Sequence, residues 1–571
     1  MASKRAALIA ELKRRRVHSV AVGYVIAGVG VLGAAEVILD PLGLGSWRTY
    51  LVFLVLAGFP IALTLAWMFE LKRETPSKAV HGNGGVGPGT DGAVSEAPVV
   101  LDKSIAVLPF TDMSPGRDQE YLCDGIAEEL INALTKVKEL HVAARTSSFH
   151  FKGTSEDIRE IGRVLNVRTI LEGSVRRDEE RIRVTVQLAS AADGYHLWSD
   201  SYDRELNDVF AIQDEISRAV VATLLPTLRG NGPQELVEVS TRSQEAYDHY
   251  LKGRYYWERR YKRGLVKALR CFVQAAEIDP NYALAHAGIA DSYCALGMYG
   301  YLSPSVARER AASAARRGVE LGVGFSETHA SLGYYQLALA WDWATGASEL
   351  DRAIGLNANN ALAHAWLGLL RGLQGRFEEA FTEIAVARQL DPLSDYGTSL
   401  LAMTHVYARE FKPALELLEK LVKSDPSVMF TLWLLSWTHF NMSDYDAAIR
   451  TAQKALPLSS NALFFKAWLG VSYGRAGMRD AAQAVLDELS ACDETQYVSP
   501  VWLAWLHFGL GHEERALDLF EEAVDERCPF LFSIHQDSFY RPFWGNPRFP
   551  ELASRVGSGV VSRAWDPAPT G

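Results

Sequence analysis

Residues 361–392 read ALAHAWLGLLRGLQGRFEEAFTEIAVARQLDP, and the pattern of this stretch returns along the chain at a fixed interval. An alanine in its second half and a leucine in its first half each recur with the same constant step. The two series are Ala380, Ala414, Ala448, Ala482 and Ala516, and Leu367, Leu401, Leu435, Leu469 and Leu503. Each leucine is followed at once by a small residue, so three series stay in register between residues 360 and 523. Such a match indicates an internal repeat with a 34-residue period.

The repeated small residues have a physical reason in helix packing. A small side chain lets two helices cross closely, and the leucine beside it fills the remaining space. Pro392 and Pro426 stand where the second helix of a unit would end, because proline cannot continue a helix. A helix-turn-helix unit with a 34-residue period resembles the tetratricopeptide (TPR) repeat. Segments 285–290 and 328–333 extend the pattern backwards, so we expect an all-α TPR superhelix of about eight units over residues 243–526.

In TPR proteins the first helix of each pair lines the concave face, and the resemblance implies which positions do so here. They are largely aromatic and predict an apolar groove that binds a helix or an extended peptide of a partner protein. The residues are Tyr396, Met403, Phe430, Trp433, Trp437, Phe440, Phe464, Trp505 and Phe508. Two other interpretations stay open. The rings pack against neighbouring helices, or the chain's own tail, from Phe530 to Phe549, lies in the groove.

Length and composition limit the class of protein. A chain of 571 residues should hold several domains, since single cores seldom grow past about 250 residues. A net charge of -11 and a pI near 5.8 argue against a general nucleic-acid binder. The five cysteines lie far apart and include no Cys-x-x-Cys pair. We therefore expect reduced thiols in a cytosolic setting and no zinc site.

Residues 1–75 carry two apolar runs, at 17–39 and 50–69, each long enough to cross a hydrocarbon core as a helix. Lysine and arginine cluster before the first run and after the second, so both ends are expected in the cytoplasm. The sequence thus predicts a two-helix transmembrane hairpin at residues 1–75, a bacterial inner-membrane location and cytoplasmic soluble domains. A cleaved signal peptide is the alternative.

Residues 76–101 are rich in glycine and proline and predict a flexible linker. The segment that follows, residues 102–228, mixes two periodicities. Its apolar residues predict strands at 104–110, 141–144, 169–176, 181–188 and 195–203, and helices at 121–134, 157–165 and 209–225. We expect an α/β domain in which helices pack against a mixed sheet.

Five motifs in this segment resemble the TolB-amino-terminal-like (FlgO-like) domain, which bacterial proteins often join to TPR repeats. They are SIAVLPF (104–110), DGIAEEL (124–130), ARTSSF (144–149), LEGSVR (171–176) and HLWSDSYDR (196–204). In some relatives the upstream region is a nucleotide cyclase catalytic domain or a winged-helix DNA-binding domain. Residues 1–16 alone precede the first apolar run, so we expect neither domain here.

Charged residues in the α/β segment raise the question of catalysis. Asp124, Glu128 and Glu129 fall on or beside one predicted helix, and Arg145 follows the second strand, so a carboxylate–guanidinium cluster is conceivable. We interpret the two glutamates as an exposed first helical turn and Arg145 as half of a surface ion pair. The sequence shows no metal-ligand spacing, nucleophile motif or phosphate loop, so we predict no enzyme activity, no cofactor and no metal.

The tail, residues 527–571, is rich in aromatic residues and should cap the last repeat. Together these features predict a non-catalytic, membrane-anchored scaffold that binds a protein partner through its TPR solenoid, in bacterial signalling or envelope-associated assembly. The alternative is a signalling enzyme or ligand sensor whose α/β domain binds a nucleotide or another small ligand. The sequence does not indicate an oligomeric state.

Overall fold

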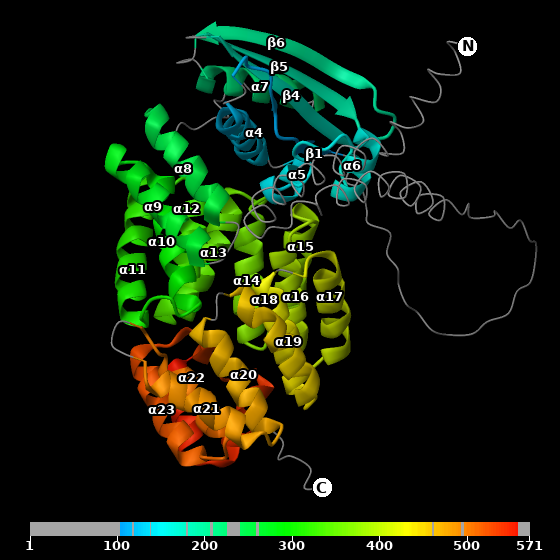
Figure 1. Cartoon of the computed structure of the whole chain (residues 1–571). Coiled ribbons are helices and arrows are strands. Elements are labelled where there is room, and N and C mark those ends of the chain that lie inside the picture. The colour runs from blue at the N-terminus through cyan, green and yellow to red at the C-terminus, as the bar shows by residue number, and fades with distance from the viewer. Residues whose placement is uncertain are drawn as a thin grey trace, which may run out of the picture. The chain divides into compact units, whose positions relative to one another are not determined.

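The computed structural model describes residues 103–557, with gaps at 117–118, 138, 179–180, 206–208, 225–239, 258–261, 427, 460–461 and 493–495. The chain divides into two units, residues 1–95 and 96–571, and all described residues belong to the second. This second unit begins with a small mixed sheet and continues as a long series of helix pairs (Figure 1). The predicted linker, residues 76–101, lies outside the described residues.

The sheet has its parallel strands on one side and its antiparallel strands on the other. Strand β1 (Ser104–Val107) lies between β3 (His141–Val142) and β4 (Thr169–Asp178) and is parallel to both. Strands β5 (Arg181–Ser190) and β6 (His196–Glu205) continue the sheet antiparallel, giving the order β3-β1-β4-β5-β6. The short β2 (Thr111–Asp112) pairs with β4.

Helices cover both faces of this sheet because successive strand residues point to opposite sides. On one face, α4 (Glu120–Thr135) and α7 (Val209–Leu224) share a core with Ile105 and Val107 of β1. On the other face, α6 (Ile158–Leu165) packs on Ala106, which lies between them in the strand. The short α5 (Arg145–Phe149) follows β3. The alternating apolar pattern of the sequence thus predicted the mixed sheet.

Eight helix pairs follow in the described residues, the number of units that the sequence period predicts. They are α8 (Gln244–Trp257) with α9 (Lys262–Ile278), α10 (Ala283–Met298) with α11 (Pro304–Leu321), α12 (Ser326–Tyr335) with α13 (Trp343–Leu356), α14 (Ala361–Leu373) with α15 (Phe377–Leu390), α16 (Asp395–Tyr407) with α17 (Phe411–Ser424), α18 (Met429–Asn441) with α19 (Tyr445–Leu458), α20 (Leu463–Arg475) with α21 (Arg479–Ser490), and α22 (Pro500–Gly509) with α23 (Glu513–Glu526). A short π-helical turn, η3 (Gln336–Ala340), ends α12.

The periodic alanines and glycines form the helix crossings. All five alanines of the 34-residue series are fully buried. At Gly368, a Cβ atom would come within 2.6 Å of the Ile384 side chain and 3.1 Å of the Ala380 carbonyl oxygen. A larger residue would force α14 and α15 apart, which explains why this position is small.

Two histidines, His329 of α12 and His364 of α14, hold neighbouring helices together. The ring Nδ1 of His329 lies 2.6 Å from a carboxylate oxygen of Glu349, and His364 makes the same contact with Glu383 at 2.6 Å. The other ring nitrogen of each histidine contacts a backbone carbonyl oxygen of the turn before its helix. These contacts join the two helices of a pair.

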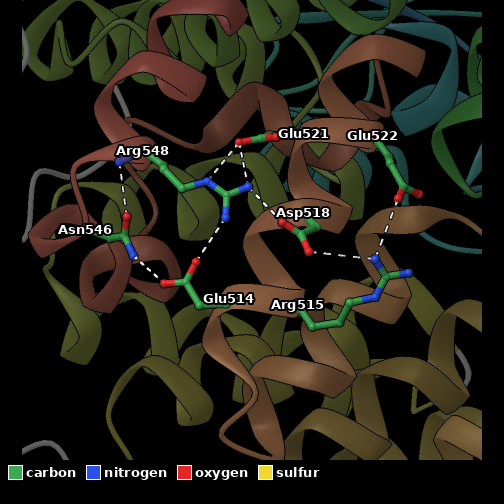
Figure 2. Close-up of polar contacts among 7 residues, drawn as sticks. All are labelled: Glu514, Arg515, Asp518, Glu521, Glu522, Asn546 and Arg548. Carbon is green, nitrogen blue, oxygen red and sulfur yellow. Dashed lines mark hydrogen bonds and ion pairs between the residues drawn. The ribbon is translucent and has the colours of Figure 1, made fainter.

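The chain beyond the last pair forms what we call the C-terminal segment, residues 529–556. It consists of two 3-10 helices, η4 (Pro529–Ser533) and η5 (Ser538–Gly545), and the helix α24 (Arg548–Val556). Its Arg548 contacts three carboxylates of α23, from Glu514, Asp518 and Glu521, at 2.8 to 3.0 Å (Figure 2). Asn546 donates to Glu514 as well, so the turn before α24 is fixed to the last repeat.

Early and late repeats also contact each other. Arg308 of α11 donates to the carbonyl oxygen of Glu526 at 3.1 Å, and Arg527 donates to that of Ala340 at 2.6 Å. The indole N–H of Trp343 donates to the carbonyl oxygen of Val556 at 3.2 Å. The second and third helix pairs are therefore joined to the end of the solenoid and to the C-terminal segment.

The fold class predicted from the sequence needs a correction. It included a two-helix transmembrane hairpin, but no helix in the described part of the chain is both long and apolar enough to cross a bilayer. The longest described helix, α11, has 18 residues and carries arginine and glutamate along its length, as expected of an amphipathic repeat helix. The predicted spans, residues 17–39 and 50–69, lie outside the described residues. The fold is mostly helical with a small mixed sheet, and the inner-membrane location that rested on the hairpin is not supported.

Candidate functional site

The nine residues predicted to line the groove come from the first helices of four successive pairs, α16, α18, α20 and α22. Seven of them line one apolar cavity of about 90 Å³, and Phe440 and Phe508 lie beside it. Three are half-buried, namely Tyr396, Phe430 and Trp433, and the other six are buried. The structure therefore brings the predicted set together.

The rings of this groove stack on one another. The Trp433 and Trp437 rings are nearly parallel, with centroids 5.8 Å apart, because they are spaced one helical turn apart on α18. Phe430 continues the stack on Trp433 at 5.9 Å, and Phe464 of α20 packs against Trp433 at 5.6 Å. Part of the aromatic character is thus explained by packing between neighbouring first helices.

The C-terminal segment fills much of the groove. The Phe530 ring stacks on that of Phe464 at 4.9 Å with an interplanar angle of 10°. Phe539 packs against Phe440 at 5.5 Å and against Phe508 at 5.4 Å. The chain's own tail therefore occupies the place that an apolar partner peptide would take, and the role of the nine residues in binding another protein stays a prediction.

A buried carboxylate fixes this segment in place. Asp537 accepts hydrogen bonds from the indole N–H of Trp437 at 3.1 Å and from the backbone N–H of Phe539 at 2.9 Å. Burial raises the pKa of Asp537 to about 7, although these donors act in the opposite direction. The groove thus combines its tryptophan stack with a polar contact that sets the register of the tail.

Three further tyrosines line the same cavity and were not predicted from the sequence. Tyr299 and Tyr301, which follow α10, and Tyr334 of α12 also line it. They lie outside the strictly phased part of the repeat, so their position could not be read from the 34-residue period. The Tyr334 ring stacks on that of Trp366 at 4.4 Å, which links Tyr334 to α14.

The charged residues of the α/β domain are arranged differently from the prediction. Glu128 and Glu129 lie in the middle of α4, not in its first turn, and their exposed fractions are 2% and 7%. Glu128 lies 2.9 Å from the Nε of Arg145 and 3.4 Å from an Nη of Arg254 on α8. The interpretation as an exposed turn and a surface ion pair is therefore wrong, because the first repeat covers this face of the helix.

We call the contact between the α/β domain and the repeats the seam. Hydrogen bonds near the Glu128 ion pairs also join the two sides of the seam. The side-chain amide of Asn359 donates to the carbonyl oxygens of Thr135 and Leu140, each at 3.2 Å. The backbone N–H of Ala144 donates to the carbonyl oxygen of Leu390 at 2.7 Å. The two parts of the second unit are thus joined by directional contacts.

The stacked helix pairs with a 34-residue period define the chain as a TPR-like repeat protein, a class that provides surfaces for protein interaction. Among solved structures, the chain resembles the crystal structure of the APC/C hetero-tetramer Cut9-Hcn1, with 16% identity and a TM-score of 0.38 over 61% of this chain and 63% of that one. It also resembles yeast Tom70, with 16% identity and a TM-score of 0.35 over 61% and 82%. A TPR protein of Thermus thermophilus matches with 20% identity and a TM-score of 0.26 over 35% and 97%. At these scores the assignment rests on the repeat of the chain itself.

The α/β domain has a match of its own. Residues 101–219 match the family model of the second domain of HilA/YgeH-like transcriptional regulators. The expected resemblance to a TolB-amino-terminal-like domain is not confirmed by this match. "Putative adenylate cyclase 3" of Rhizobium meliloti (strain 1021) is 42% identical over 187 residues, which are 33% of this chain. The chain spans about a third of the length of that relative.

Proposed function

We propose that the chain is a non-catalytic scaffold that binds a protein partner through the concave face of its TPR-like region. In this arrangement residues 102–228 form the α/β domain, residues 243–526 the repeat solenoid and residues 527–571 its cap. The observation that carries the proposal is the aromatic cavity of about 90 Å³ that stays beside the C-terminal segment. Aromatic and methionine side chains in a concave wall are typical of sites that accept an apolar anchor from a partner.

The half-buried rings indicate where the partner would bind. Tyr396, Phe430 and Trp433 lie at the cavity and are less covered than Trp437 or Trp505. An apolar side chain on a helix or an extended peptide would contact these three rings first. The partner would then either share the groove with the C-terminal segment or displace it.

Site-specific cross-linking of the full chain in cells tests this proposal. A photoreactive benzoylphenylalanine at position 430 should give a discrete cross-linked product with one protein. The matched control is position 381, because Phe381 is also a half-buried phenylalanine but lies on the second helix α15. Equal products from both positions, or none from position 430, would contradict binding in the groove.

A quantitative test follows once the cross-linked protein is identified. Phe430→Ala in the full chain should weaken its binding at least about tenfold, since anchoring aromatic residues contribute on the order of 2 kcal/mol. Phe381→Ala should leave the dissociation constant unchanged. A thermal unfolding scan of both variants shows whether any loss comes from misfolding.

The relative named as a cyclase does not alter this proposal. Its match covers 33% of this chain and 32% of the relative, so its activity is not transferred here. The supporting argument against catalysis is chemical. The buried carboxylate Glu128 is already paired with two guanidinium groups, an arrangement that holds the seam together.

A further inference from the structure

A large cavity lies between early and late repeats, beside the aromatic groove. Its volume is about 830 Å³, compared with about 90 Å³ for the cavity of the groove. Its wall combines the start of α9 and the turn after α10 with α20, α22 and the segments that precede these two helices. Cavities of roughly 300–1,000 Å³ are the usual size of small-molecule sites. We call this one the inter-repeat cavity.

Aromatic rings make up much of its wall. The Tyr497 ring meets that of Trp502 edge to face, with centroids 6.3 Å apart, and the Phe464 ring lies 6.2 Å from that of Trp502. Tyr299 and Tyr301 line the cavity from the early repeats. Such a wall suits a ligand with a planar aromatic body.

The charged side chains of the wall leave a positive balance. Lys466 forms an ion pair with Glu488, so these two charges cancel. In the described part of the chain no carboxylate pairs with Lys262 or Arg263, which also line the cavity. The Nζ of Lys262 lies 5.3 Å from the centroid of the Tyr301 ring, a contact that leaves its charge in place. The described wall thus keeps two uncompensated cations, although the chain as a whole has a net charge of -11.

Both of these cations lie in the first turn of α9, which holds no acidic residue. The N–H groups at the start of a helix carry partial positive charge, so cations are unfavourable there and an anion is favourable. A bound anion would therefore offset the charges of two side chains and of the helix end together.

A buried donor in the same wall calls for an acceptor. The Trp502 side chain is 2% exposed, and its indole Nε1 has no hydrogen-bond partner among the residues that the structure describes. The edge of this ring lies against Gly300, where a Cβ atom would come within 2.2 Å of the Trp502 Cζ2. Glycine at this position thus lets the indole approach the turn after α10. An unpaired buried N–H is costly, so a ligand oxygen that accepts from it would stabilise the folded chain.

We propose that the inter-repeat cavity binds a small aromatic organic acid. The acid group lies near Lys262 and Arg263, the ring packs among the aromatic side chains of the wall, and an oxygen atom of the ligand accepts from the Trp502 N–H. A cation would meet the two uncompensated charges, and a purely apolar molecule would leave the indole unpaired. Binding does not depend on the proposed protein partner. Because early and late repeats both contact the ligand, it stabilises their junction.

Thermal unfolding of the full chain tests the chemical class of the ligand. 1-Naphthoate at millimolar concentration should raise the unfolding temperature measurably, because it combines a planar ring with a carboxylate. At equal ionic strength, 1-naphthylmethylammonium reverses the charge and acetate lacks the ring, so neither should raise it. No shift with 1-naphthoate, or an equal shift with either control, would overturn the proposal.

Calorimetric titration of 1-naphthoate then locates the site. The double variant Lys262→Gln with Arg263→Gln should bind it at least about tenfold more weakly, since both changes remove charge-assisted contacts to the acid group. The matched control is Lys267→Gln with Arg270→Gln, because these are also exposed cations of α9 but do not line the cavity. Unchanged affinity in the first variant, or an equal loss in both, would overturn the assignment. The titration needs no partner, whereas cross-linking from position 430 does, so failure of one proposal is distinguishable from failure of the other.

Discussion

The aromatic groove and the polar seam both contain cavities, but the side chains that line them differ in chemistry. In the groove, apolar rings bury one another and the C-terminal segment fills most of the remaining space. In the seam, charged side chains face each other across cavities of about 140 and 190 Å³. An apolar surface can be covered by any apolar segment of matching shape. A buried charged group, in contrast, requires a hydrogen-bond partner or an opposite charge at a defined position. The comparison teaches that apolar packing, with one polar contact at Asp537, fills most of the groove, whereas charged side chains line the cavities of the seam.

The largest effect should come from emptying the groove. Phe539 is buried and packs against rings from three first helices, so Phe539→Ala removes a core side chain and leaves a cavity. We expect the free energy of unfolding to fall by about 3–5 kcal/mol in urea denaturation. Phe381→Ala, on the outer helix α15, should cost much less. A loss below about 1 kcal/mol in Phe539→Ala would show that the tail does not sit in the groove in solution.

The second prediction concerns the Asp537 carboxylate of the groove. Burial raises the pKa of Asp537 to about 7, whereas an unfolded aspartate titrates near 3.9. The folded state therefore holds the proton more tightly, and the penalty for the charged form grows as pH rises from about 4 to 7. Relative to Asp537→Asn, the wild-type chain should lose stability over this range, on the order of 4 kcal/mol in total, since each pKa unit is about 1.4 kcal/mol.

The measurement is urea denaturation of both proteins at pH 4, 5.5, 7 and 8. The groups near Asp537 are the donors Trp437 and the Phe539 backbone, together with Asn441, Tyr407 and Tyr540. All of them are present in both proteins, so their contributions cancel in the difference. A constant difference across this range would mean that Asp537 has an ordinary pKa and is reached by water.

The smallest effect should come from the seam. Arg254→Met keeps most of the apolar stem but removes one of the two guanidinium groups at Glu128. Arg145 stays in place at 2.9 Å, so the buried carboxylate keeps a partner. We expect a loss of about 1–3 kcal/mol, because the buried carboxylate loses one of its two cationic partners. Arg317→Met, which removes an exposed i,i+3 pair with Glu320, is the control and should be nearly neutral.

How much of this could be predicted from the sequence depends on the range of the interactions. The 34-residue period located helix crossings such as that of Gly368 with Ile384, because the crossing depends on residues within one unit. It also placed Trp433 and Trp437 on one face, since they are one turn apart. The period could not show that Glu128 is buried, because α8, which covers it, comes much later in the chain.

The tail shows the same limit. Its aromatic residues predicted that it must be buried, but the Phe530 ring stacks on Phe464 of α20, which lies two helix pairs back along the chain. An apolar composition predicts that a segment is buried, but it does not predict which surface of the protein covers it. For the same reason Tyr299 and Tyr301, which complete the cavity from an early repeat, had no local signal.

The contacts of Arg308 with Glu526 and of Trp343 with Val556 have a consequence for how the chain withstands stress. In an open solenoid the terminal repeats can unfold one by one, because each repeat contacts only the repeats next to it. Here the second pair is bonded to the last pair and the third pair to the C-terminal segment, so unfolding this end of the solenoid also breaks bonds to the early repeats. The chain should therefore resist unfolding that starts at its C-terminal end. Any protein that displaces the C-terminal segment would also break its bond to the third helix pair.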